Sequence, residues 1–213
     1  MTRARATYPV APRLDDTIVA FSSPPGRAPR GLSRFSGSAL MALLGRLAHD
    51  GQSPDHHAPH ATQRFDLNWS AGAAMTSHLT IHLGPRSYTG QDMAELQMPG
   101  NPILQEALVV RAVQAGARRA EPGEFTYRRF MAGKIDLTQA EGVAATIAAV
   151  SDIQLEAATR LRAGRLGSLV ARLVGDLANA LALVEAGIDF IDQEDVVPGT
   201  RPTLARQIDD LRR

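Results

Sequence analysis

The chain has 213 residues, a formal net charge of +1 and no cysteine. Disulfides, thiolate metal sites and a cysteine nucleophile are therefore excluded. The hydrophobic fraction of 44% and the charged fraction of 21% are typical of a soluble globular protein. The net charge says little about partners, because nucleic-acid binders usually carry a basic excess or a basic face. We find no apolar run of bilayer length and no secretory signal, so we expect a cytoplasmic protein with no membrane contact.

The first 135 residues mix strand and helix signals. Residues 1–14 are rich in Pro, Arg and Ala, which predicts a flexible tail. The β-branched run at 15–23 and the alternating run at 77–84 predict strands. Leucines at helical spacing in 38–51 predict a helix, and residues 101–119 predict another that stops at Gly116. This mixture predicts an α/β or α+β domain over residues 15–135.

Residues 136–213 have a helical pattern. Thr138 with Glu141, and Ser151 with Gln154, have the spacing of capping boxes, so we expect helices to begin there. Between residues 166 and 188, Leu, Val and Ile recur every three or four positions in one apolar stripe. These helices form a partial antiparallel bundle that cannot cover the stripe alone. Either they dock on the first domain or they pair with another chain, and we favour the second. The whole chain is then expected to be α+β.

Three histidines, His56, His57 and His60, lie in the polar segment 52–63. Imidazoles at this spacing can bind a divalent metal, but Asp55 is the single nearby carboxylate and ordering the loop is costly. We therefore expect a polar loop and no metal. The carboxylates of residues 184–199 likewise fit an acidic helix end better than a catalytic pair.

Residues 23–37, "SPPGRAPRGLSRFSG", place three arginines among glycines directly after a strand. This composition fits an anion-binding turn and a proline-stiffened hairpin with solvated arginines equally well. It is neither a P-loop nor a dinucleotide fingerprint, and the P-loop pattern occurs nowhere in the chain.

Residues 84–97 combine turn signals with two acids. Asp92 and Glu95 fit the first turn of a helix, where acids suit the helix dipole, and Glu95 also fits a carboxylate that binds a ligand ring edge.

In residues 122–142, "PGEFTYRRFMAGKIDLTQAEG", a turn precedes a dense polar segment. Phe125 and Phe130 are expected to anchor it, and Glu124, Arg128 and Arg129 are expected to form ion pairs at a domain junction. Asp136 is a second candidate for a helix cap.

Three of these segments resemble the MnmE (TrmE) family of tRNA-modification GTPases. "DTIVAFSSPPGRAPRGLSRFSG" is similar to the family pattern DTI-A--TPPGRG--G--R-SG, and "LGPRSYTGQDMAELQMPGN" to PGP-S-TGED--E-Q-HGG. "PGEFTYRRFMAGKIDLTQAEGVAATIAA" is similar to PGEFT-RAFLNGK-DL-QAEAV-DLI-A, and "VEAGIDF" also recurs. The resemblance covers roughly residues 15–195.

The resemblance implies a domain over 15–135 that binds 5-formyltetrahydrofolate, or a related tetrahydrofolate, and dimerises. Residues 136–213 would form the first part of a central helical domain. The folate-contacting residues of the family correspond to Arg34, Glu95 and Lys134. A carboxylate can accept from the N–H pair of a pterin, and Arg or Lys can meet carbonyl or carboxylate oxygens.

This sequence departs from the family pattern at several points. The family inserts a GTPase domain at about the point where this chain ends, and the family's C-terminal Cys-x-Gly-Lys motif is absent. In the segment that corresponds to the family's HGG, Pro99 stands in place of the histidine. In the segment that corresponds to GRGAIG, this chain has GRAPRG, with Pro29 and Arg30 in place of the family's alanine and isoleucine.

We therefore expect a truncated or stand-alone MnmE-like protein of tRNA wobble-uridine (U34) modification. It would bind a formyl-tetrahydrofolate and form a homodimer, have no GTPase activity of its own, and reach tRNA only indirectly, with other tRNA-modification proteins. One alternative is a degenerate paralogue that acts as a helical scaffold without folate. Another is an independent one-carbon enzyme, which rests on fold analogy alone.

Overall fold

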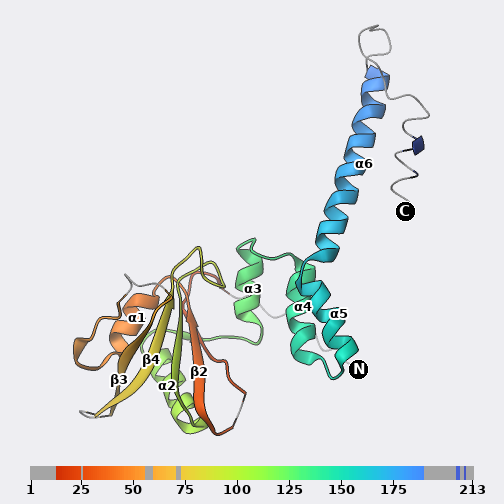
Figure 1. Ribbon diagram of the computed structural model, residues 1–213. Helices are drawn as coiled ribbons and strands as arrows, with labels where there is room; N and C mark the ends of the chain where they lie inside the picture. Colours follow the sequence, from red (N-terminus) through yellow and green to blue (C-terminus); the bar gives the residue numbers. More distant parts are fainter. Residues whose placement is uncertain are drawn as a thin grey trace, which may run out of the picture. The chain divides into compact units, whose positions relative to one another are not determined.

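The computed structural model describes residues 13–24, 26–55, 60–70 and 73–189, together with residues 205, 206 and 209. The chain forms two compact units, Met1–Ile135 and Asp136–Arg213, and each is described by itself (Figure 1). His56 and His57, most of the expected tail and the acidic segment 190–199 lie outside the described residues.

Unit 1 is built on one six-stranded sheet in the order β3-β4-β5-β2-β1-β6. The strands are β1 (Ile18–Phe21), β2 (Ala28–Ser36), β3 (Thr62–Ser70), β4 (Ala73–His82), β5 (Met93–Gly100) and β6 (Arg118–Arg119). All neighbouring strands are antiparallel except β1 and β6, which are parallel. The first two strands form a hairpin, which is one of the two structures that the segment 23–37 fitted equally well.

Two helices cover one face of this sheet, α1 (Leu40–Leu47) and α2 (Pro102–Gln114). The buried apolar residues of both helices belong to the core that packs against the sheet. Burying each large apolar side chain stabilises the fold by roughly 1.5–3 kcal/mol. The core of the unit consists of the four leucines predicted from helical spacing, residues of α2 and one face of five strands: Leu40, Leu43, Leu44, Leu47, Leu108, Val109, Ala112, Val19, Phe35, Phe65, Leu67, Leu79, Ile81, Ala94, Leu96 and Met98.

The expectation of a helical first turn at Asp92 and Glu95 was wrong, because this segment forms β5. Ala94, Leu96 and Met98 are buried while Glu95 and Gln97 are only partly buried, which is the period-two alternation of a half-buried strand.

Two further short elements complete unit 1, the 3-10 turn η1 (His49–Gly51) and the helix α3 (Glu124–Met131). The expected apolar anchors of α3, Phe125 and Phe130, are only half-buried. The fully buried side chains of this helix are instead Glu124 and Arg128, so a polar network anchors it.

Unit 2 contains the helices α4 (Leu137–Ala148), α5 (Asp152–Arg162) and α6 (Arg165–Asp189). The residue that caps α4 is Asp136, in a capping box with Gln139, and not Thr138. Thr138 instead donates its hydroxyl proton to the Asp136 carboxylate at 2.7 Å. Ser151 caps α5 as its spacing predicted. The chain is thus an α+β protein, a mixed sheet with helices followed by helices alone.

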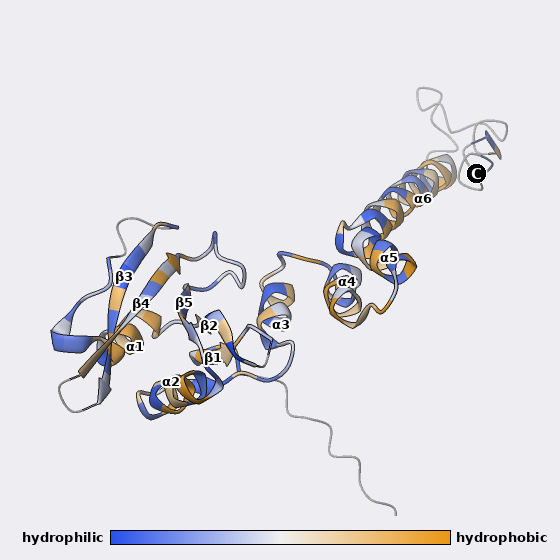
Figure 2. Cartoon of the chain, turned by 60° about the horizontal axis from the view of Figure 1, so that its bottom comes forward, coloured by the Kyte–Doolittle hydropathy of each residue, from blue (hydrophilic) through white to orange (hydrophobic). Residues whose placement is uncertain are grey.

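Helix α6 exposes the apolar stripe that the sequence predicted. Leu166, Leu173, Leu177 and Leu181 are each more than a third exposed. By length and composition alone the segment Arg165–Ala186 would suffice to cross a bilayer, so the expectation that no such run exists was wrong. Many helices of soluble proteins pass the same test, and α6 carries charged residues between its apolar positions (Figure 2).

Candidate ligand-binding face of the sheet

The face of the sheet opposite α1 and α2 carries mostly polar side chains. Because side chains alternate along a strand, the residues that do not face the core share this second face. Strand register orders them in rows across β2, β5 and β4, with β3 beyond. One row contains Arg34, Glu95, Thr80 and Thr62, the next contains Leu32, Gln97, His78 and Arg64, and on the other side Ser36, Met93 and His82 form a third.

Arg34 and Glu95, which the family resemblance singled out, are direct cross-strand partners on this face. The Arg34 Nε donates to the Glu95 Oε1 at 2.8 Å, and both side chains are partly exposed. Among the described residues, nothing occupies the terminal nitrogens of Arg34 or the second oxygen of Glu95. The pair therefore keeps donors and acceptors for a planar polar ligand.

A histidine pair lies one row away. The Nδ1 atoms of His60 and His82 are 2.8 Å apart, so one ring must donate and the other accept. Burial lowers the pKa of His82, the charges of His60 and Arg34 lower it further, and the Glu95 carboxylate opposes them. Within the described ranges no group of three or more His, Asp or Glu side chains is arranged to bind a metal.

Lys134 follows α3, and its side chain contacts the loop 83–92 that joins β4 to β5. Its Nζ donates to the carbonyl oxygen of Pro85 at 2.6 Å and to that of Ser87. Since an ammonium group carries three donors, one is left for a ligand. Ser36 of the open face contacts Thr89 of the same loop at 2.7 Å. The structure therefore pairs Arg34 with Glu95, whereas Lys134 bonds the carbonyl oxygens of the adjoining loop and does not contact that pair.

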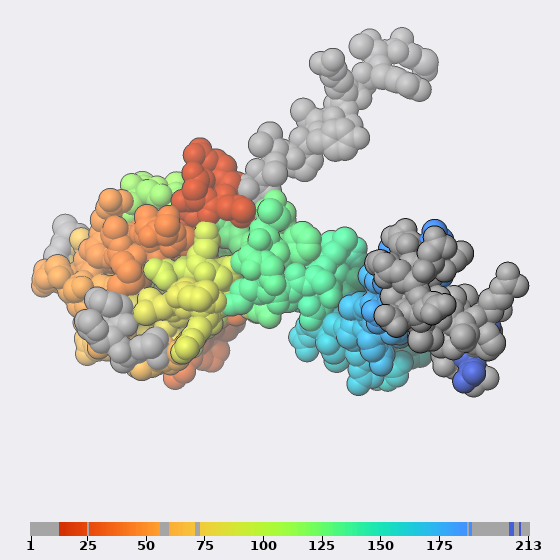
Figure 3. Space-filling model, turned by 90° about the horizontal axis from the view of Figure 1, so that it is seen from above, coloured from red at the N-terminus to blue at the C-terminus, as the bar shows by residue number. Residues whose placement is uncertain are grey.

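The loop can approach α3 closely because of a glycine. Gly90 has φ +85°, and a Cβ there would lie 3.0 Å from the Ala132 Cβ. Seen from above, the yellow atoms around residue 85 lie beside the green atoms of α3 (Figure 3). Arg129 of α3 also stacks on Tyr88 of the loop, with its guanidinium carbon 4.6 Å from the ring centre.

A buried ion network holds α3 against the sheet. The Glu124 carboxylate accepts from Arg118 at 2.6 Å and from Arg128 at 3.1 Å, and Asp16 pairs with both arginines. Arg128 also donates to the side-chain oxygen of Gln91 in the loop at 2.8 Å. Burial acts to raise the pKa values of Asp16 and Glu124, but the hydrogen bonds from the arginines outweigh it, so both pKa values lie below their ordinary range.

The expected ion pair between Glu124 and Arg128 is thus confirmed, whereas Arg129 stacks on an aromatic ring. Sequence reasoning missed Asp16 and Arg118, which lie 102 residues apart in the chain. No local spacing could have connected them.

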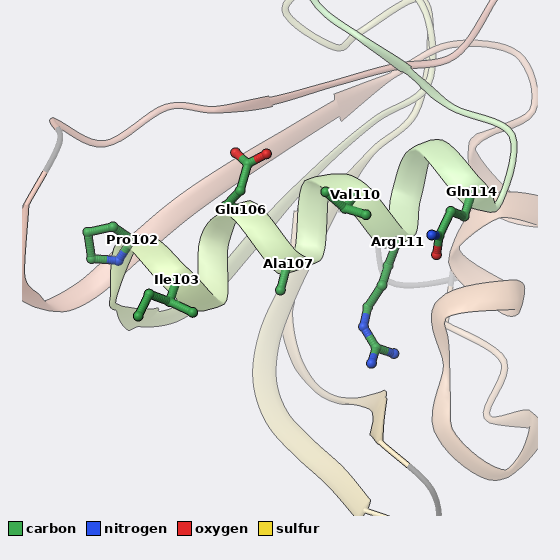
Figure 4. A pocket seen from close by; sticks show the side chains of 7 residues that line it. All are labelled: Pro102, Ile103, Glu106, Ala107, Val110, Arg111 and Gln114. Atoms are coloured by element: carbon green, nitrogen blue, oxygen red, sulfur yellow. The ribbon is translucent and has the colours of Figure 1, made fainter.

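A wider groove of about 760 Å³ runs along the outer side of α2 (Figure 4). Ile103, Ala107 and Val110 give it an apolar lining between Glu106 and Arg111. Glu106 is paired with Arg119, and Arg111 donates to backbone carbonyls of β3. With its charges already satisfied, this groove offers less to a polar ligand than the open face of the sheet.

Comparison with known proteins agrees with this architecture. Residues 17–134 match the family model described as "GTP-binding protein TrmE N-terminus", and residues 137–213 match the MnmE helical domain. The chain is 39% identical over 184 residues to the tRNA modification GTPase MnmE of Laribacter hongkongensis, an alignment that covers 86% of this chain. It is 40% identical over 201 residues to that of Rhodopirellula baltica, which covers 93% of this chain.

The chain spans only about 40% of the length of these relatives: 40% of the Laribacter protein and 43% of the Rhodopirellula protein. The two matched models correspond to a sheet-containing unit and a helical unit, and together they account for most of the sequence. The chain belongs to the MnmE (TrmE) family of tRNA modification GTPases, of which it carries the N-terminal and helical domains.

Proposed function

We infer that the open face of the sheet binds a formyl-tetrahydrofolate and that the chain serves tRNA wobble-uridine modification. The main support for this proposal is the ion pair of Arg34 and Glu95 in a TrmE-type domain. Its Nε and Oε1 atoms are 2.8 Å apart, on the face of the sheet opposite α1 and α2. Glu95 would accept from the N–H edge of the pterin, and Arg34 would donate to its carbonyl oxygen. Lys134, with one free donor beside the loop carbonyls, would meet a carbonyl or carboxylate oxygen of the same ligand.

In this role the chain is cytoplasmic and homodimeric, and it reaches tRNA with other tRNA-modification proteins. The folate supplies the one-carbon unit when bound, and the residues of this chain bind and orient it. GTP hydrolysis is not assigned to these residues, since the sequence contains no P-loop pattern.

Isothermal titration of the chain with 5-formyltetrahydrofolate tests this proposal. We expect binding in the wild type and a loss of about thirtyfold in Glu95→Gln, because the neutral amide forfeits charge-assisted hydrogen bonds. Glu106→Gln is the matched control, since it neutralises a paired glutamate on α2, behind the sheet. No binding by the wild type, or equal binding by both variants, would refute the assignment.

A second candidate is a scaffold that pairs through its helices without folate. The observation that favours it is the exposed apolar stripe of α6. Light scattering would then show an oligomer whose mass does not respond to added folate. A folate-dependent mass or a measured folate affinity would favour the first candidate.

A further inference from the structure

Three of the departures of this sequence from the family pattern lie at one place on the open face. Pro29 and Arg30 replace residues of the GRGAIG segment, and Pro99 replaces the histidine of HGG. All three line a single depression of about 210 Å³, on two neighbouring strands. Two segments almost seventy residues apart thus differ from the family pattern at residues that line the same depression.

Polar side chains of the neighbouring strands complete the lining of this depression. His78 and Gln97 are direct partners across β4 and β5, and Thr76 lies two residues before His78 on the same face of β4. His78 and Gln97 belong to the row next to the Arg34–Glu95 pair, so the depression continues the same face.

The backbone of β2 is irregular at this point. The register between β2 and β5 shifts between Ala28 and Gly31, as in a β-bulge. Bulges re-aim side chains and recur beside functional sites. Here the irregularity brackets Arg30, whose side chain lines the depression.

Charge favours an anion in this depression. Most arginines of unit 1 have partners, but Arg30 is exposed and has no ion pair or hydrogen bond within the described part of the chain. One carboxylate lies close by: the Thr76 hydroxyl donates to Asp66 at 2.7 Å. That charge is already countered by Arg64 at 3.2 Å, so the guanidinium of Arg30 is uncompensated.

We propose that Arg30, with His78 and Gln97, forms a subsite for the carboxylates of the folate's glutamate tail. This inference rests on the proposed function, in which Glu95 holds the pterin. Arg30 lies four residues before Arg34, or about 13 Å at the usual rise along a strand. That separation suits a ligand whose pterin and glutamate are joined by an aminobenzoyl spacer. A guanidinium can bind a carboxylate through two parallel hydrogen bonds.

The test compares two probes by isothermal titration, 5-formyltetrahydrofolate and 5-formyltetrahydropterin, which lacks the aminobenzoyl-glutamate tail. Arg30→Gln should weaken folate binding about tenfold and leave pterin binding unchanged, because one charge-assisted contact is lost. Arg30→Lys should recover part of the affinity. Arg27→Gln is the matched control, since it removes an unpaired arginine of the same hairpin that does not line the depression.

The outcomes separate this inference from the proposed function. If the wild type binds neither probe, both fail. If Glu95→Gln weakens folate binding as expected and Arg30→Gln does not change it, the tail subsite alone is wrong. Equal loss of both probes in Arg30→Gln would also overturn the subsite. Titration with a short single-stranded RNA completes the test: if Arg30→Gln weakens RNA binding and not folate binding, the depression serves a nucleic-acid phosphate and the proposal is refuted.

Discussion

The buried network around Glu124 should carry a measurable share of the stability of unit 1. In Glu124→Gln the side chain keeps its shape but loses its charge, while the fully buried Arg128 keeps only Asp16 as an acidic partner. Breaking a buried ion pair by removing one partner costs about 3–5 kcal/mol. Because an amide oxygen can still accept one of the hydrogen bonds, we expect a loss near the lower end, about 3 kcal/mol.

Trp69 is the one tryptophan of the chain and lies in β3, so its fluorescence reports the unfolding of unit 1. Urea titration followed at Trp69 should show a lower midpoint for Glu124→Gln with an unchanged slope. Glu106→Gln breaks an exposed pair with Arg119 and should cost less than about 1 kcal/mol. If Glu124→Gln is no more destabilising than Glu106→Gln, the network does not hold α3 as we argue.

The acid dependence follows from the same network. The pKa values of Asp16 and Glu124 lie below their ordinary values of 3.8 and 4.5 in the folded state. Their stabilisation is therefore complete above these ordinary values and is lost as the pH falls through the lowered folded pKa values. Wild-type stability should fall steeply below about pH 4.5, with a shallower fall in Glu124→Gln.

Three other predictions concern separate features. Gly31→Ala should destabilise unit 1 by about 1–3 kcal/mol in urea titration, because its Cβ would lie 1.8 Å from Nε2 of the buried Gln105. An unchanged urea midpoint would show that the Gln105 side chain can move aside. Because the pKa of His82 is lowered in the folded state, the unfolded state binds a proton first as the pH falls below 6.5. The free energy of unfolding of the wild type should therefore fall in this range, and that of His82→Gln should not. Parallel profiles of unfolding free energy against pH would contradict this. The double variant Leu173→Glu, Leu177→Glu should reduce the mass measured by light scattering, because the new charges interrupt the exposed apolar stripe. Asn179→Glu, on the opposite side of α6, should leave the mass unchanged. Equal masses for the two variants would show that α6 does not mediate association.

The sequence predicted those elements whose apolar spacing is regular and whose burial is one-sided. The leucines of α1 and the apolar positions of α2 have the helical period, and both helices were predicted. Strand β5 was misread because its open face carries Glu95 and Gln97 and its end carries Pro99 and Gly100, which weaken the strand signal. Strand β2 was described only as a hairpin, since its first half is rich in Pro, Arg and Gly.

The candidate site, too, could be predicted from the sequence only in part. The residue types of Arg34, Glu95 and Lys134 were available from the motifs, but the pairing of the first two depends on the register of β2 and β5. The engagement of Lys134 with loop carbonyls depends on the path of residues 83–92. Neither register nor loop path can be read from spacing, because both are set by contacts between segments distant in the chain.

The two outer strands of the sheet differ in how readily they would accept a foreign strand. On one side, β6 has only two residues, both arginines, so it presents almost no unpaired backbone and a repelling charge. On the other side, β3 is nine residues long, and Ala48 forms an isolated bridge to Leu67. The Gln52 side chain also bonds the carbonyl oxygen of Arg64 and the amide of Asp66, and Arg111 donates to the carbonyl oxygen of Asn68. Side chains of the same chain thus occupy part of its outer backbone, and the ion pair of Arg64 and Asp66 adds charge near the middle of the strand. Loss of the Gln52 and Arg111 side chains would uncover these backbone groups and make β3 the edge at which copies of this domain would pair.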